Sequence, residues 1–167
     1  MDEMLDILVA FWTEGYAEYH GQHYDFARGG MFPVPTAPIP IWIGGSSLTA
    51  ARRAARFDGY APMTMGEMDD ETREQFALID DLRAQEGRAG AFSRHVPWMG
   101  GNDPSMVGQL RDSDSITDFD VSPWQLGLPT PPSSLGDQTI EYGGRDLPFS
   151  AKRTAAEAFA NAVIRAS

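Results

Sequence analysis

The segment Ile39-Pro40-Ile41-Trp42-Ile43-Gly44-Gly45-Ser46-Ser47 is a short apolar run that ends in two glycines and two serines. Its length and its β-branched residues predict a buried strand rather than a helix. Residues 48–56 carry small apolar side chains on one narrow face, which predicts a helix that packs closely on a sheet. We expect Ser46 or Ser47 to cap this helix. The sequence therefore predicts a strand, a glycine turn and a helix in direct succession.

The same alternation continues toward the C-terminus. Because parallel strands are joined by crossover helices, it predicts an α/β fold with a parallel sheet. The count is about four strand–helix units, half of the eight in a closed (β/α)8 TIM barrel, so the expected fold is a partial barrel. The further strands are expected at 58–63, 92–98 and 116–121, and the further helices at 69–86, after Asp103-Pro104, and after a cap at Ser150 or in the capping box Thr154-x-x-Glu157.

The N-terminal region has a different pattern. Residues 1–14 place large apolar side chains at spacings of three and four, which predicts an amphipathic helix that stops at Gly15. Residues 18–26 resemble a small hairpin, and four prolines predict an extended arm up to Pro40. Residues 122–149 are rich in proline and glycine and predict a loop. We find no internal repeat and expect a single domain over residues 1–167.

Composition excludes several classes of function. The net charge of −11 argues against a nucleic-acid partner, because phosphate backbones are bound by positive surfaces. There is no cysteine, so disulfides and cysteine-ligated metals are excluded. No apolar run reaches the roughly 20 residues that span a membrane, and the acidic start Met1-Asp2-Glu3 does not resemble a secretory signal. We therefore expect a cytoplasmic protein with no membrane partner.

The glycine pair and the serines are the main candidate for a binding site. Glycines let the backbone approach a ligand closely, and the first amides of a helix attract anions. Gly44, Gly45, Ser46 and Ser47 could therefore hold one phosphate group. The same four residues also suit a plain strand-to-helix turn, with glycine for geometry and serine as the cap.

Residues 39–47, followed by Ala51-Arg52-Arg53-Ala54-Ala55-Arg56 and Asp58-Gly59-Tyr60, resemble the bacterial luciferase-like monooxygenase superfamily, and most closely its coenzyme F420-dependent oxidoreductase branch. Residues 1–13 are similar to the mid-chain helix of that family, 19–35 to the arm that follows it, 116–124 to the last barrel strand, and 158–164 to the last helix. The resemblance thus extends over most of the chain.

The resemblance implies a (β/α)8 barrel with a cofactor, F420 or alternatively FMN, at the carboxyl ends of the strands. It assigns the cofactor phosphate to Gly44, Gly45, Ser46 and Ser47, with help from Thr64, which leaves the next strand beside Met63. It also implies a small-molecule substrate. It assigns no catalytic residue, because none of the matching positions is one in the family.

The family places four further strands before the position of Met1. We therefore expect the chain to be the C-terminal half of a barrel that pairs with an N-terminal half or forms a homo-oligomer. Two functions follow: a luciferase-like oxidoreductase or monooxygenase, or a truncated, non-catalytic half-barrel that serves as an assembly subunit. The exposed edges of half a sheet favour pairing in either case.

Three other groups of residues are candidates for a functional site. His20 and His23 have the spacing of a metal pair but lack an obvious third ligand, so a surface hairpin is the better interpretation and no metal is expected. His95 is interpreted as a hydrogen-bonded structural residue. Asp118 and Asp120 share one face of a strand, which would suit an acid–base pair if a substrate lay beside them.

Overall fold

The structure of the chain is a computed structural model that describes residues 1–64, 68–97, 105–121 and 148–165. Its centre is a four-stranded sheet in the order β3-β4-β5-β6, and every neighbouring pair is parallel. The strands are β3 (Trp42–Gly45), β4 (Gly59–Pro62), β5 (Ser93–Pro97) and β6 (Asp118–Asp120). The predicted α/β fold with a parallel sheet is therefore confirmed.

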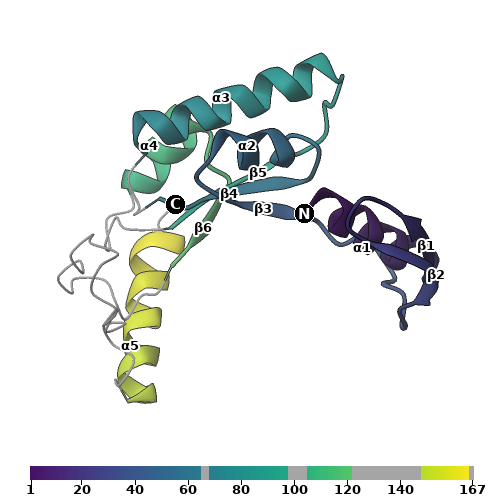
Figure 1. Cartoon of the computed structure of the whole chain (residues 1–167). Helices are drawn as coiled ribbons and strands as arrows, with labels where there is room; N and C mark the ends of the chain where they lie inside the picture. Colours follow the sequence, from purple (N-terminus) through teal and green to yellow (C-terminus); the bar gives the residue numbers. More distant parts are fainter. Residues whose placement is uncertain (65–67, 98–104, 122–147, 166–167) are drawn as a thin grey trace, which may run out of the picture.

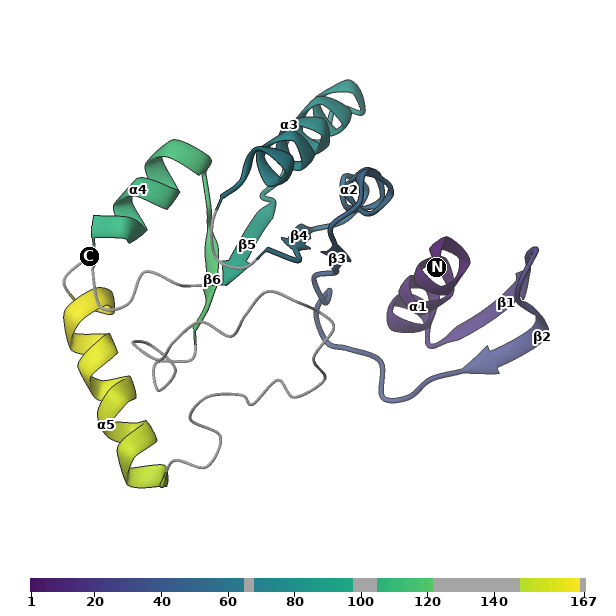
Figure 2. The ribbon, with the colours of Figure 1, turned by 60° about the vertical axis from the view of Figure 1, so that its left-hand side comes forward.

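The helices follow one another along one face of this sheet. They are α2 (Leu48–Ala54), α3 (Asp70–Gln85), α4 (Ser105–Asp114) and α5 (Phe149–Phe159), which continues as the π-helical turn η2 (Ala160–Ile164). Figure 2 shows them on an arc outside the strands. The side chains buried between helices and strands form the core, which includes Ile41, Ile43, Ala51, Ala54, Tyr60, Phe76, Ile79, Val96 and Ile116.

The N-terminal part is built from α1 (Asp2–Glu14) and an antiparallel hairpin of β1 (Tyr16–His20) and β2 (Asp25–Gly30). Helix α1 ends at Gly15, which is left-handed and donates its N–H to the carbonyl of Phe11, as predicted. The carboxylate of Glu3 accepts the backbone N–H groups of residues 22, 23 and 24 at 2.9–3.1 Å. A single side chain of α1 therefore satisfies the hairpin turn.

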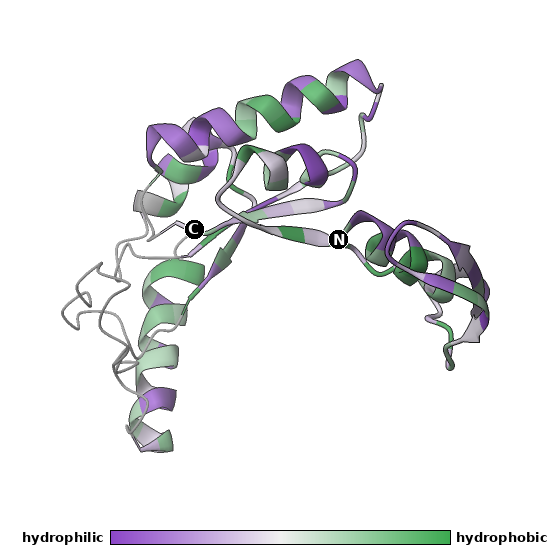
Figure 3. Cartoon of the chain, viewed as in Figure 1, coloured by the Kyte–Doolittle hydropathy of each residue, from purple (hydrophilic) through white to green (hydrophobic). Residues whose placement is uncertain are grey.

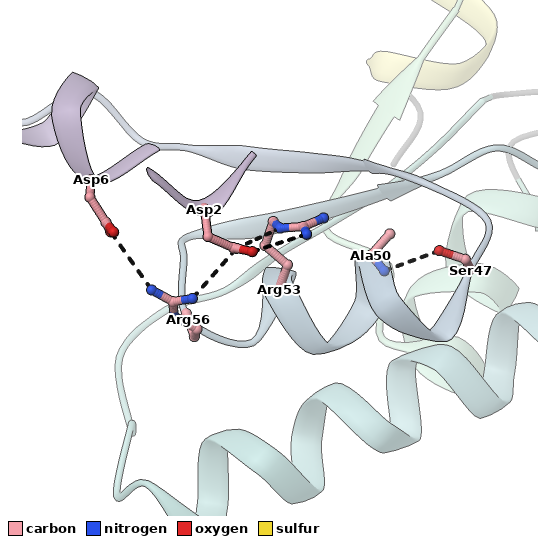
Figure 4. Close-up of polar contacts among 6 residues, drawn as sticks. All are labelled: Asp2, Asp6, Ser47, Ala50, Arg53 and Arg56. Atoms are coloured by element: carbon pink, nitrogen blue, oxygen red, sulfur yellow. Dashed lines mark hydrogen bonds and ion pairs between the residues drawn. The ribbon is translucent and has the colours of Figure 1, made fainter. Parts of the chain in front are cut away.

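Ion pairs join α1 to α2 (Figure 4). Arg53 donates through Nε and Nη2 to the two carboxylate oxygens of Asp2, at 2.7 and 3.2 Å. Arg56 lies 3.5 Å from Asp2 and 3.8 Å from Asp6. The N-terminal part is thus fixed to the outer side of the sheet next to β3 (Figure 1).

Buried Arg83 on α3 binds the segments that lead into β4 and β5. Its guanidinium donates to the carbonyls of Ala55, Phe57 and Gly90 and lies 4.6 Å from the ring centre of Phe92. Its charge is thus held by three carbonyls rather than by a carboxylate. Figure 3 shows that much of the rest of α3 is hydrophilic, as expected for a helix with one face exposed to solvent.

The opposite face of the sheet is covered by no helix among the residues the structure describes (Figure 1). Trp42 projects from this face of β3 and is 41% exposed. Its ring lies over Gly59 of β4, where a Cβ would stand only 2.6 Å from Trp42 Cδ1, and packs against His95 of β5 with ring centres 5.6 Å apart. We refer to this surface of Trp42, Gly59 and His95 as the open face.

Some boundaries differ from the predictions. Strand β3 begins at Trp42 and includes both glycines, because Gly44 and Gly45 pair with Ala61 and Pro62 of β4. Helix α5 begins at Phe149, so the predicted capping box is wrong: Thr154 lies inside the helix and donates to the carbonyl of Ser150. The predicted cap at Asp103-Pro104 and residues 122–147 of the loop predicted at 122–149 lie outside the described residues. The end of that predicted loop is wrong, because Phe149 is the first residue of α5. No helix in the described ranges is long and apolar enough to cross a membrane.

Candidate functional site

The turn between β3 and α2 has the predicted strand–turn–helix geometry. Strand β3 ends at Gly45 and α2 begins at Leu48. Gly45 has a φ of +135°, a region that side chains rarely occupy, and a Cβ there would stand 3.1 Å from the Cβ of Ala50. Glycine is therefore required at position 45. The chain reverses at this point without a side chain in the way.

The two serines have different environments. Ser47 is the cap of α2, because its Oγ accepts the N–H of Ala50 at 3.2 Å (Figure 4). Ser46 is exposed, and its hydroxyl has no hydrogen-bond partner among the described residues. The backbone N–H groups of residues 46–49 likewise have no partner within those ranges. The turn thus offers several unused donors in one short segment.

The carbonyl groups of Gly45 and Ser46, by contrast, are engaged by buried side chains. Gly45 O lies 2.7 Å from the hydroxyl of Tyr60 and accepts the N–H of Met63 at 3.3 Å. Ser46 O accepts Nε2 of Gln75 at 2.9 Å. Gln75 was not predicted from the sequence, because the helix that carries it is recognised by its apolar residues. The one available signal is its position directly before the inward-facing Phe76.

Gly44 provides room beside the turn. It is exposed, and a Cβ built on it would meet only the carbonyl of Ala61, at 3.8 Å, among the described atoms. Pro62 pairs with Gly45, so Met63 and Thr64 leave β4 at the same edge of the sheet. Met63 is 82% exposed there. The fold therefore places four of the residues predicted for a cofactor phosphate, Gly44, Gly45, Ser46 and Ser47, in one turn, and the fifth, Thr64, at the same edge of the sheet.

This arrangement has the chemistry of an anion cradle. Unpaired N–H groups and a serine hydroxyl are donors, and the glycines let a ligand reach the backbone. A phosphate group fits such a donor set, whereas a metal cation does not, because cations need oxygen or nitrogen lone pairs. The described residues include no group of three or more metal-ligating side chains that could hold an ion.

The histidines predicted as alternatives lie elsewhere. His20 in the hairpin is held by Asp25 at 2.5 Å on Nδ1 and by Glu18 at 2.9 Å on Nε2, and these bonds raise the pKa of its ring. The antiparallel pairing of β1 and β2 confirms the predicted surface hairpin. His95 was interpreted as hydrogen-bonded, which is wrong for Nδ1: this nitrogen is buried without a partner among the described residues.

The two aspartates of β6 do share a face. Asp118 and Asp120 pair with His95 and Pro97 across the parallel ladder, so all four lie on the same side of the sheet. Asp118 accepts a hydrogen bond from the hydroxyl of Thr117 at 2.6 Å. The ladder therefore places His95, Asp118 and Asp120 on the open face. Among the described residues, no hydrogen bond or ion pair joins these three side chains.

A separate cavity of about 800 Å³ lies at the opposite edge of the sheet. It is lined by α1, the arm at 34–39 and the residues that precede β3 and β4, such as Ile41 and Asp58. None of the residues 44–47 reaches it. Parallel α/β proteins bind their ligands beyond the carboxyl ends of the strands, so the turn and not this cavity is the candidate site.

A parallel α/β unit with a glycine–serine turn at the carboxyl edge is typical of enzymes that bind phosphate-bearing cofactors. The model of the luciferase-like monooxygenase family matches residues 1–98, more than half of the chain. The chain therefore belongs to the luciferase-like monooxygenase family. This confirms the superfamily that the segment 39–60 indicated.

The chain is also similar to mycobacterial proteins named only as uncharacterized. It is 38% identical over 144 residues to Rv0940c and MT0967 of Mycobacterium tuberculosis and to Mb0965c of Mycobacterium bovis. The match covers 84% of this chain and 49% of each relative. The chain thus spans about half the length of the curated relatives it matches. No solved structure matches it significantly.

Proposed function

We propose that this chain supplies the cofactor-phosphate end of a luciferase-like oxidoreductase site. The observation that carries the proposal is the turn at 44–47, where the amides of residues 46–49 have no partner among the described residues while the adjacent carbonyls are engaged. The proposed cofactor is coenzyme F420, with FMN as the alternative. Membership of the family and the resemblance of residues 39–60 to its F420 branch support this choice.

Each residue of the turn has a role in this proposal. Gly44 and Gly45 let the phosphate approach the backbone, and the amides of Ser46 and Ser47 donate to its oxygens. The exposed hydroxyl of Ser46 adds a donor, and Thr64 contributes from the neighbouring strand end. When bound, the deazaflavin or flavin ring supplies hydride transfer or oxygen activation, and the protein positions it.

The open face suggests how the site is completed. We propose that it packs against a further half-barrel, provided by an N-terminal half or by a second copy of this chain, and that together they enclose a small-molecule substrate. The length of the relatives, about twice the matched region, supports this arrangement. So does the exposure of Trp42, because a large aromatic side chain on a sheet face is normally covered.

The same exposure supports a second function, a half-barrel that acts in assembly without catalysis. That function predicts an oligomer that binds no deazaflavin or flavin. The oxidoreductase proposal predicts that the turn binds cofactor once the open face is covered. Cofactor binding therefore separates the two.

The variant Gly44→Asp tests the proposed site. Gly44 has no positive φ and has room for a side chain, so the new carboxylate adds negative charge beside the turn without backbone strain. Gly45→Asp is a poorer test, because the φ of +135° would strain any side chain at that position. The matched control is Gly90→Asp, which adds the same charge at a position where a Cβ meets nothing within 4 Å of the described atoms.

The measurement is the dissociation constant of F420 and of FMN, followed by fluorescence titration. We expect Gly44→Asp to weaken binding by at least tenfold, because a like charge repels the phosphate, and Gly90→Asp to bind as the unmodified chain does. Equal weakening in both variants, or equal affinity in all three proteins, would overturn the site. If the unmodified chain in its purified oligomeric form binds neither cofactor, the assembly function is favoured.

A further inference from the structure

The buried pair Tyr60 and Gln75 lies directly behind the candidate phosphate turn. We propose that these two are positioning residues: they hold the carbonyls of Gly45 and Ser46 toward α3 and thereby orient the amides of Ser46 and Ser47 toward the ligand. This inference rests on the proposed function for its ligand, but its structural part can be tested without any ligand.

The contacts form one connected network. The hydroxyl of Tyr60 lies 2.7 Å from Gly45 O and 2.7 Å from Oε1 of Gln75. Nε2 of Gln75 donates to Ser46 O at 2.9 Å and lies 3.4 Å from the carboxylate of Glu71. Tyr60 is 0% and Gln75 2% exposed. The single proton of the Tyr60 hydroxyl is shared between two acceptors, Gly45 O and Oε1 of Gln75. Two polar groups that are hidden from water therefore contact two successive carbonyls of one turn.

The orientation of the amides follows from peptide geometry. In a planar trans peptide the carbonyl of one residue and the N–H of the next point in opposite directions. Because Gly45 O points at Tyr60, the N–H of Ser46 points away from it. Because Ser46 O points at Gln75, the N–H of Ser47 also points away from α3. Both amides therefore point away from the buried pair Tyr60 and Gln75.

The chemistry of the pair suits this role better than a purely structural one. A buried polar side chain costs free energy unless it is bonded, so packing alone would be served by apolar residues at 60 and 75. Burial, followed by the negative charge of Glu71, raises the pKa of Tyr60 to about 12. The hydroxyl consequently remains a neutral donor throughout the physiological pH range.

The first measurement is affinity for FMN and riboflavin, two ligands that differ only by phosphate. F420 and its riboside, which lacks the whole phosphate-bearing tail, form a second pair. We expect Tyr60→Phe and Gln75→Met each to weaken binding of the phosphate-bearing ligand about fivefold, the factor typical of one lost hydrogen bond. The phosphate-free ligand should bind each variant as it binds the unmodified chain. Equal weakening for both ligands would overturn the positioning role.

The second measurement is amide hydrogen exchange of the full chain by mass spectrometry, without ligand. The N–H groups of Ala50 and Ala51 are bonded to Ser47 Oγ and Ser47 O, so a loosened turn exposes them. Tyr60→Phe should accelerate exchange in the segment 45–51. The control is Thr72→Val, since Thr72 is 4% exposed on α3 and bonds Asp69 rather than the turn.

Unchanged exchange at 45–51 in Tyr60→Phe, or the same acceleration in Thr72→Val, would overturn the inference. The conservative change at Tyr60 keeps the test available if Gln75→Met fails to fold. If the unmodified chain binds none of the four ligands, the proposed function fails, and exchange alone then decides whether Tyr60 and Gln75 hold the turn. The two failures are therefore distinguishable.

Discussion

Arg53 donates hydrogen bonds to both carboxylate oxygens of Asp2, from Nε to Oδ1 at 2.7 Å and from Nη2 to Oδ2 at 3.2 Å. This two-point contact connects the first turn of α1 to the last turn of α2, 51 residues further along the chain. The guanidinium lowers the pKa of the Asp2 carboxyl. The pair is the most direct polar link between the N-terminal helix and the helix that follows the candidate site.

Asp2→Asn should reduce the free energy of unfolding by about 0.5–1 kcal/mol, because the pair is partly exposed but has two-point geometry. Urea denaturation measures the effect. The control is Arg52→Gln, which removes a neighbouring arginine that is exposed and has no ion-pair partner among the described residues. Equal losses in Asp2→Asn and Arg52→Gln would show that the contact contributes nothing specific.

Glu3 should make the hairpin sensitive to acid. Hydrogen bonds from the backbone N–H groups of His23, Gln22 and Tyr24 lower the pKa of the Glu3 carboxyl below its ordinary value of 4.5, and the bond from His23 has the largest effect on this pKa. The stabilisation is therefore complete above pH 4.5 and is lost as the pH falls through the lower pKa of the folded state. Glu3→Gln should flatten this part of the stability–pH profile, while Glu14→Gln on the same helix should not. Identical acid profiles for the two variants would contradict the assignment.

His95→Phe should leave the free energy of unfolding unchanged or raise it by up to about 1 kcal/mol. The variant keeps a flat ring against Trp42 and removes a buried nitrogen that has no partner in the described part of the chain. His23→Phe in the hairpin turn controls for the change in composition. A loss of more than 1 kcal/mol in the His95 variant alone would mean that its nitrogen is bonded in solution.

The open face should prevent the chain from behaving as a compact monomer. Strands β3 and β6 are the two edges of the sheet, and each has one side without a partner among the described strands. Trp42, on the open face, is 41% exposed to solvent. We expect a dimer or larger assembly in size-exclusion chromatography with light scattering, or binding of an apolar dye. A monomer that unfolds cooperatively and binds no dye would refute the half-barrel proposal.

The order of strands and helices could be predicted because their signals are local. The apolar run before Gly44, the small apolar face of residues 48–56 and the helix expected at 69–86 each predicted one element, and the structure confirms all three as β3, α2 and α3. The start of α5 was missed because Ser150 and Thr154 both resemble caps, while the structure begins the helix at Phe149 after Pro148. Pro148 occupies the cap position, where serine, threonine, aspartate and asparagine are the usual residues, so the local sequence points to the wrong start.

The candidate site was predictable only in part. The glycine pair and the serine cap are visible in the sequence, and so is the position of Thr64 after the next strand. The network behind the turn is not, because Tyr60 and Gln75 are 15 residues apart and meet only through packing of α3 on β4. The unpaired nitrogen of His95 also depends on its neighbours across the sheet, which no local pattern reveals.

The contact between Trp42 and Gly59 also limits which substitutions these two positions can accept in evolution. The indole occupies the space that a Cβ at position 59 would need, with 2.6 Å between them, and Ser93 closes the other side at 2.9 Å. A substitution at 59 is therefore tolerated only after the ring at 42 has been replaced by a smaller one. In an alignment of relatives the two positions should co-vary, with glycine at 59 wherever tryptophan stands at 42.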